Sequence, residues 1–476
     1  MQRIINDWFN RLVGAASEGN FSGKEQYAAH RTTRDYIWNS VGLGVWAMTF
    51  PLLTVIITQL VGTELAGKFS LAYVVGLLLM FVANYGVRTY QVSDIDEVHA
   101  FSDYQINRLI TCIVMLLLGI VYSLLRGYES EMFIISMGVY VFFMINGLAD
   151  TYEGRLQQVS KLYLAGISQT VRSLVVLVLF ILSLLIFRSL AIACIVMAVA
   201  SLLSFVFLTL PLALLESPKS RKFNLDSVKT IFIQCLPLFL AIFLFNLVDS
   251  MPRFVMEGVL SYDNQLYFSA LYFPAQAILI LIQLIYRPQL VRMANLWGEG
   301  GQRRKFDLMV IVICLVIIVL TLLLVLLMGS IGLPVMSFLY GFDFEDFRGL
   351  CFIMLAAGGI TAAIDFIYQA ITVIREQRSA TRIYLITFVF SLFVPILLMT
   401  YAGLEGIVLS YLIVMSILCV LLVVEFFSIR YRAIRESIEA DREEHHRRLT
   451  PEERSRRKRL QERREAWERK NFRKHQ

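Results

Sequence analysis

Long apolar runs, about twelve in number and separated by short polar segments, constrain most strongly what this chain of 476 residues can fold into. Each run holds about twenty residues, and a helix of that length spans the hydrocarbon core of a bilayer. The hydrophobic share of the sequence, 57%, is higher than that of ordinary soluble domains. The sequence therefore predicts an all-α polytopic membrane protein with about twelve transmembrane helices.

The expected helices form two groups of six on either side of a basic linker. The first group is expected at 37–60, 66–88, 106–126, 132–150, 163–187 and 189–211, and the second at 230–251, 266–287, 307–328, 349–373, 381–402 and 405–428. The predicted organisation is a cytoplasmic N-terminal segment, a first lobe, a cytoplasmic linker, a second lobe and a charged cytoplasmic tail, at 1–36, 37–211, 212–229, 230–428 and 429–476.

The two ends of the chain are polar, in contrast to the lobes. Apolar residues recur at helical spacing from Ile4 to Val13, which predicts a short amphipathic helix in the membrane interface or a solvated helix against the lobes. The formal net charge of +7 lies entirely in the tail. We expect the tail to be drawn to anionic lipid at the inner leaflet, and we expect no nucleic-acid partner.

The distribution of Lys and Arg predicts the orientation in the membrane. With the N-terminus inside, the outer segments carry only five of these residues: Lys68, Arg126, Arg188, Arg253 and Arg348. Twelve crossings return the C-terminus to the cytoplasm. The outer loops are expected to be short, the longest running from Gly329 to Arg348, and none offers a domain for an extracellular enzyme site.

A repeat links the two predicted lobes. The sequence FSLAY at 69–73 recurs as FSALY at 268–272, and Arg88 and Arg287 follow the two copies at the same distance. Chance similarity between apolar helices is one explanation. An internal duplication is the other, and duplicated halves are the usual architecture of secondary transporters.

Charged residues within the expected helices are costly in a bilayer and point to a polar cavity. Arg172 lies well inside the fifth helix, where the alternatives to a cavity are snorkelling and a structural pair. Asp249 and Arg253 are spaced to form a salt bridge on one helix face. Asp365 on the tenth helix is a candidate proton or cation site, or a hydrogen-bonded structural residue.

Uncharged polar residues, and the lack of metal-ligand and nucleotide-binding motifs, further restrict the kinds of ligand that the chain could bind. Asn39 and Asn246 suit either sugar hydroxyls or contacts between helices. Asp150 and Glu153 are expected to be solvated at the inner mouth of the fourth helix. The six cysteines fall in apolar runs without metal-ligand spacing, and the chain has no P-loop. We expect no metal and no cofactor, with H⁺ or Na⁺ as candidate coupling ions.

The chain resembles the polysaccharide exporters of the MOP superfamily, and the Wzx-type flippases most closely. The resemblance spans about residues 35–428 and is carried by Pro51, Gly62 and Gly67, by GVRTYQVSD at 86–94 with Tyr104 and Arg108, and by DTYEGRLQ at 150–157. It implies two six-helix lobes facing each other in a V, in a bacterial cytoplasmic membrane. It also implies transport, by alternating access, of a polyprenyl-(pyro)phosphate-linked oligosaccharide to the outer leaflet for cell-surface polysaccharide assembly.

The resemblance also implies roles for particular residues. Arg88 and Arg287 would meet the phosphate head at the inner ends of their helices, although they also suit positive-inside anchors. The full set of candidates is Arg88, Arg172, Arg253, Arg287, Asn39 and Asn246 for substrate, with Asp249 and Asp365 for a coupling ion. Glycan-assembly proteins are candidate partners.

Two other functions remain open. A MATE-like drug or cation antiporter of the same superfamily would expect acidic groups in its cavity, whereas arginines favour an anionic ligand. A membrane glycan polymerase or ligase would need a substantial outer loop with reactive residues. The short outer loops expected here argue against the enzyme.

Overall fold

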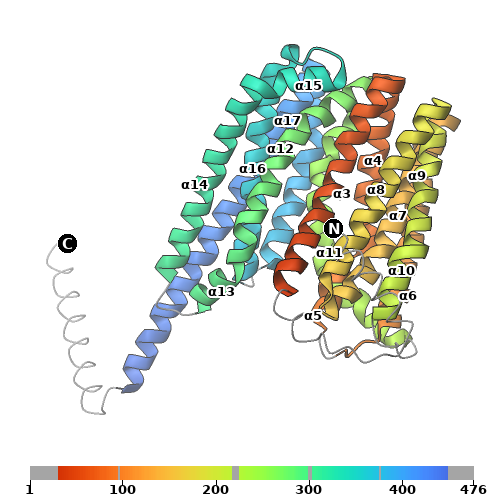
Figure 1. The fold of residues 1–476 in the computed structure, drawn as a ribbon. Helices are drawn as coiled ribbons and strands as arrows, with labels where there is room; N and C mark the ends of the chain where they lie inside the picture. Colours follow the sequence, from red (N-terminus) through yellow and green to blue (C-terminus); the bar gives the residue numbers. More distant parts are fainter. Residues whose placement is uncertain (1–30, 95–96, 217–223, 299–302, 375–376, 449–476) are drawn as a thin grey trace. The chain divides into compact units, whose positions relative to one another are not determined.

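A computed structural model describes residues 31–94, 97–216, 224–298, 303–374 and 377–448 (Figure 1). Within these ranges the chain is helical almost throughout and contains no β-strand, which confirms the all-α prediction. The interfacial helix expected near Trp8 and the end of the charged tail lie outside the described residues. The chain divides into two compact units, Met1–Cys419 and Val420–Gln476.

The first half of the chain forms long helices with two local irregularities. Its α-helices are α3 (Arg31–Val61), α4 (Thr63–Asn84), α5 (Val87–Ser93), α6 (Phe101–Leu125), α7 (Ser130–Gln158), α8 (Leu162–Phe187), α9 (Leu190–Ser204) and α10 (Leu210–Glu216). A π-helical turn, Phe205–Thr209, joins α9 to α10. The helix expected to run to residue 88 ends at Asn84, because Tyr85 and Gly86 adopt left-handed φ angles of 48° and 69°. Arg88 therefore lies on the separate short helix α5.

The second half contains more helix than the sequence predicted. Its α-helices are α11 (Leu225–Met256), α12 (Tyr262–Tyr286), α13 (Leu290–Gly298), α14 (Arg303–Leu327), α15 (Leu333–Tyr340), α16 (Arg348–Val373) and α17 (Gln377–Arg448). The expectation of a loop from Gly329 to Arg348 is wrong over most of that segment. A π-helical turn, Met328–Gly332, continues α14 into α15, because the segment is largely apolar and Pro334 is tolerated near a helix start.

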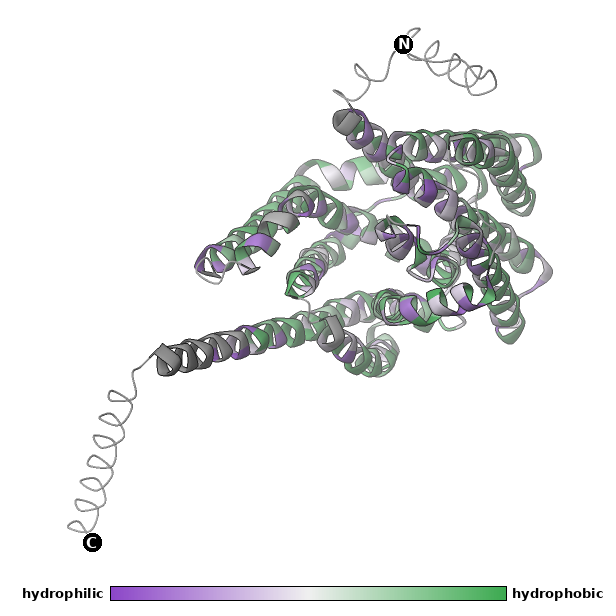
Figure 2. Cartoon of the chain, turned by 90° about the horizontal axis from the view of Figure 1, so that it is seen from below, coloured by the Kyte–Doolittle hydropathy of each residue, from purple (hydrophilic) through white to green (hydrophobic). Residues whose placement is uncertain are grey.

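Eleven described helices are long and apolar enough to cross a membrane. The last of these spans, Ser379–Arg432, has 54 residues and is interrupted at Ala402 and Gly403, whose backbone angles are not helical. The break divides the span into the two helices that the sequence predicted there. Leucines on the surface of these helices are widely exposed, for example Leu117 at 56% and Leu322 at 59%, as suits a lipid-facing surface. Figure 2 shows hydrophobic residues along most of the helical length.

Packing between helices repeats in the two halves. On α4, Gly76 lies where an added Cβ would come within 2.5 Å of the Phe143 ring on α7. In the second half Gly358 on α16 lies against Ala275 on α12, so both contacting residues there are small. Gly76 and Ala275 are separated by the same offset as Phe69 and Phe268. The repeated contact supports an internal duplication.

Helices of the two halves also contact each other. Helix α11 packs against α4, α5 and α6. In addition, α4 packs against α12, and α3 contacts α15. At the α4–α12 contact a Cβ on Gly67 would lie 1.9 Å from the carbonyl oxygen of Tyr262, so only glycine fits there without a shift.

Candidate functional site

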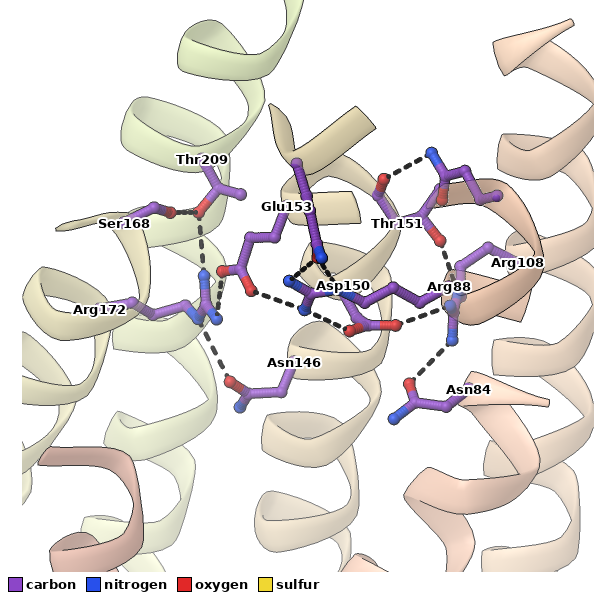
Figure 3. Close-up of polar contacts among 12 residues, drawn as sticks. Asn84, Arg88, Arg108, Asn146, Asp150, Thr151, Glu153, Ser168, Arg172 and Thr209 are labelled. Carbon is purple, nitrogen blue, oxygen red and sulfur yellow. Dashed lines mark hydrogen bonds and ion pairs between the residues drawn. The ribbon is translucent and has the colours of Figure 1, made fainter. Parts of the chain in front are cut away.

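A cluster of charged side chains lies inside the first half, where α5, α6, α7 and α8 converge (Figure 3). It contains three arginines, Arg88, Arg108 and Arg172, and two carboxylates, Asp150 and Glu153. The acidic residues and their amide neighbours form one stripe along α7, because helix positions three to four residues apart share a face. The cluster carries one more positive than negative charge.

Asp150 is the shared acceptor of two arginines. Its Oδ1 lies 2.9 Å from Arg88 Nη1, and its Oδ2 lies 2.9 Å from Arg108 Nη2. The expectation that Asp150 is solvated is wrong, because its side chain is only 18% exposed. Two charged donors compensate the cost of removing this carboxylate from water.

Arg108 is a fully buried structural residue in this cluster. In addition to Asp150, its guanidinium donates to the Thr151 hydroxyl at 2.6 Å, the Ala83 carbonyl at 2.7 Å and the Asn84 side-chain oxygen at 2.8 Å. Its side chain is 1% exposed. Because its donors are occupied on all sides, Arg108 holds Asp150 in place and has little access to a ligand.

Glu153 pairs with Arg172 on the other side of the stripe. Arg172 Nη2 lies 2.9 Å from Glu153 Oε1, and both side chains are at most 5% exposed. The expectation of a solvated Glu153 is therefore also wrong. Arg172 Nη1 donates to Thr209, the last residue of the π-helical turn between α9 and α10. Arg172 Nε donates to Asn146. Single π-turns within helices are frequent at functional sites.

A cavity of about 250 Å³ opens beside this cluster. Its polar lining consists of Asn39, Arg88, Glu153, Gln157 and Gln169. With 30% of its side chain exposed, Arg88 is the most accessible of the three arginines, and it also donates to Gln157 Oε1 at 3.0 Å. The lining therefore combines one accessible guanidinium with amide groups and the carboxylate of Glu153.

A second polar site lies in the other half, around Asp249 on α11. The two carboxylate oxygens accept hydrogen bonds from Tyr272 Oη at 2.6 Å and Tyr411 Oη at 2.7 Å. The salt bridge expected between Asp249 and Arg253 is not among the ion pairs of the described residues. The guanidinium of Arg253 lies over the Tyr272 ring, 4.3 Å from its centroid, and within the described chain its Nε has no hydrogen-bond partner.

The remaining candidates lie elsewhere. Asp365 on α16 accepts hydrogen bonds from Gln283 at 3.1 Å and from the Tyr286 hydroxyl. Arg287 donates to Gln283 at 2.7 Å and is otherwise exposed. Asn246 donates to the carbonyl of Ile242 one turn earlier and lines neither of the two cavities described here.

The structure thus brings Asn39, Arg88 and Arg172 together, and places Asp249 beside Arg253. Sequence reasoning missed Thr209 and the parts played by Arg108, Asp150 and Glu153. A signal existed for the two acidic residues, which lie three apart and therefore on one helix face. No group of three or more metal-ligating side chains is found in the described ranges.

No family model matches the chain, and no curated protein matches it by sequence. Solved structures of MATE transporters do match its fold. A mutant of the Vibrio cholerae MATE transporter VcmN aligns with a TM-score of 0.56 and 16% identity, covering 87% of this chain and 99% of that chain. The eukaryotic MATE transporter AtDTX14 aligns with a TM-score of 0.56 and 14% identity, covering 85% and 99%.

A third match is an outward-facing multidrug resistance MATE family transporter of the MOP superfamily. It aligns with a TM-score of 0.54 and 15% identity, covering 84% of this chain and 95% of the other. At these identities the matches show a shared fold. The chain is therefore a multi-pass membrane protein with the fold of MATE transporters.

Proposed function

We propose that this protein is a transporter of the MOP superfamily that moves a polyprenyl-(pyro)phosphate-linked oligosaccharide from the inner to the outer leaflet. The observation that carries the proposal is the cavity beside Arg88, whose accessible guanidinium lies among the amides of Asn39, Gln157 and Gln169 and the carboxylate of Glu153. A planar guanidinium suits phosphate oxygens, and side-chain amides suit sugar hydroxyls. Together with the MATE fold, this lining favours an anionic glycolipid.

The charge of the cluster explains how an anion could enter without a large cost. Arg88 contacts Asp150 at 2.9 Å and Glu153 at 3.9 Å, so these carboxylates occupy the guanidinium when no ligand is bound. Asp150 keeps Arg108 as a partner if a phosphate displaces it from Arg88. The exchange of one anion for another on Arg88 therefore leaves no buried charge unpaired.

Movement of the ligand across the membrane would follow alternating access, in which binding shifts the balance between inward-open and outward-open forms. Asp249 and Asp365 are our candidates for binding the coupling H⁺ or Na⁺, since each lies on a membrane helix and accepts bonds from neutral groups. No other cofactor is proposed. We place the protein in the bacterial cytoplasmic membrane with both termini inside and with the basic tail against anionic lipid, beside glycan-assembly proteins.

The decisive experiment is to follow lipid-linked intermediates by mass in cells that lack the protein. We expect a single lipid-linked repeat to accumulate on the cytoplasmic side, with surface glycan restored by the parent gene. Arg88→Gln should fail to restore it, whereas the matched change Arg348→Gln should restore it, because within the described residues the one ion pair of Arg348 is with the exposed Glu345. Normal surface glycan in the deletion strain would contradict the proposal.

A cation-coupled drug antiporter is the second candidate, and the Asp249 site favours it. A buried carboxylate held by two tyrosine hydroxyls can accept a proton or a cation without first breaking an ion pair. This function predicts that loss of the protein increases sensitivity to cationic drugs and leaves lipid-linked intermediates unchanged. The same deletion strain distinguishes the two functions.

A further inference from the structure

A buried glutamate joins the two halves at the end of the bundle that is predicted to face outward. Glu257 follows α11, and its side chain is 4% exposed. It accepts hydrogen bonds from Arg126 Nη2 at 2.7 Å, from Tyr128 Oη at 2.6 Å and from the Tyr122 hydroxyl. All three donors belong to α6 and the turn that follows it, whereas the acceptor belongs to the second half.

Arg126 is bound to more than the carboxylate. The same Nη2 also donates to the backbone carbonyls of Phe254 and Glu257, at 3.0 and 3.2 Å. Burial lowers the pKa of Arg126, but the hydrogen bond and charge of Glu257 together outweigh it and raise this pKa overall. Burial is the main cause of the raised pKa of Tyr128. Both donors therefore keep their protons at physiological pH.

Other contacts between the halves lie at the same end. Gln59 on α3 donates to the carbonyl of Leu339 on α15 at 2.8 Å, and Gly67 on α4 lies against Tyr262 on α12. At the opposite end the contacts described between the halves involve α11 or the residue before it, as where the backbone of Asn224 donates to Asp103 at 2.7 Å. Helix α11 thus contacts the first half toward both ends, whereas Gln59 and Gly67 contact α15 and α12 at the outward end.

We propose that Glu257 and Arg126 form a latch that holds the outward end closed, and that releasing this pair shifts the protein toward an outward-open form. Opening this end would separate the carboxylate from all three donors. A cavity of about 470 Å³ borders Arg126, Tyr128 and Glu257, and it gives water a route to the separated charges. The latch rests on the proposed alternating access and is independent of which substrate is carried.

The test uses a buried reporter on the face of α4 that meets α12. Ser70 lies one turn after Gly67 and is fully buried, so Ser70→Cys should react with a membrane-impermeant maleimide from outside only when this end opens. We expect Glu257→Gln and Arg126→Gln each to raise the labelling rate at least several-fold. Each variant is also labelled without the Ser70 substitution, which measures the background reaction of the six native cysteines.

Glu345→Gln is the matched control, because Glu345 pairs with Arg348 in an exposed contact within the second half. It should leave the labelling rate unchanged. The reversed pair Arg126→Glu with Glu257→Arg should return the rate toward that of the parent.

Unchanged labelling in both single variants would overturn the latch, as would an equal rise in the control. Arg126→Gln decides the outcome if Glu257→Gln fails to reach the membrane, because Arg126 is 36% exposed and its loss is easier to accommodate. Labelling does not depend on the substrate, so failure of the latch and failure of the proposed function are separate results.

Discussion

Arg88 and Arg108 bind the same carboxylate but differ in what surrounds them. The side chain of Arg108 is 1% exposed, and it donates to three acceptors besides the shared carboxylate. The side chain of Arg88 is 30% exposed and borders a cavity. Removing one member of a buried ion pair typically costs about 3–5 kcal/mol, because the partner charge stays buried. We therefore expect Arg108→Gln to lower the thermal unfolding temperature of the purified protein strongly.

Arg88→Gln is the matched change on the other arginine. It should lower the unfolding temperature much less, since Asp150 retains Arg108 and water reaches the site. An equal loss of stability in the two variants would show that Arg88 is a structural residue rather than an accessible one.

Glu153 competes with an anionic ligand for Arg172 and Arg88 in this arrangement. We expect Glu153→Gln to tighten the binding of inorganic pyrophosphate, used as a probe of the cavity, by about tenfold, which corresponds to about 1.4 kcal/mol. Calorimetric titration of the purified protein would measure this. Glu131→Gln, on the exposed start of the same helix, should leave the affinity unchanged. Weaker binding in the Glu153 variant would indicate that the carboxylate positions the arginines rather than competing with the ligand.

Sequence reasoning located Arg172 because a charge inside an apolar helix stands out, and it located Arg88 through the repeat that it shares with Arg287. It misjudged Asp150 and Glu153, because distance from a helix end does not determine solvation. Solvation of such a position depends on the helices that cover it. Here α5, α6 and α8 bring three arginines to the carboxylates. The i, i+4 spacing of Asp249 and Arg253 likewise could not reveal that two tyrosines from other helices occupy the carboxylate.

Close approach between helices depends on individual glycines. An added Cβ on Gly358 would lie 2.6–2.8 Å from atoms of Ala275, whereas Gly349 on the same helix has nothing within 4 Å. We expect Gly358→Ala to destabilise the protein by about 1–3 kcal/mol through overpacking. Gly349→Ala should be neutral or slightly stabilising, because alanine favours the helix. Thermal unfolding of both variants measures the difference, and similar values would show that α16 can shift away from α12.

Helices were predicted well where a long apolar run defined them, and less well where the backbone departs from a regular α-helix. The π-turn that brings Thr209 to Arg172 has no separate hydropathy signal, since it continues an apolar run. The break at Tyr85 was missed for a similar reason: the apolar pattern continues to Arg88, and a left-handed tyrosine is not apparent from composition.

At the scale of the whole molecule, the number of crossings decides where the C-terminus lies. A continuous helix of the 54 residues Ser379–Arg432 would be about 80 Å long, far more than the roughly 30 Å of a hydrocarbon core. The break at Ala402 and Gly403 resolves this, since Gly406 lies so close to Leu398 that a Cβ would come within 2.0 Å of its carbonyl oxygen. The two helices on either side of the break therefore turn back on each other.

Two crossings in this segment make twelve within the described residues, an even number, so both termini should lie on the same side. The scarcity of Lys and Arg in the alternate segments predicts that this side is the cytoplasm. Epitope tags at the two ends should then both resist protease in intact cells and become cleavable after permeabilisation. A tag inserted after Asp343, which is exposed between α15 and α16, should be cleavable from outside. Termini on opposite sides would mean that the break does not lie at the membrane surface, and that the segment crosses the bilayer only once.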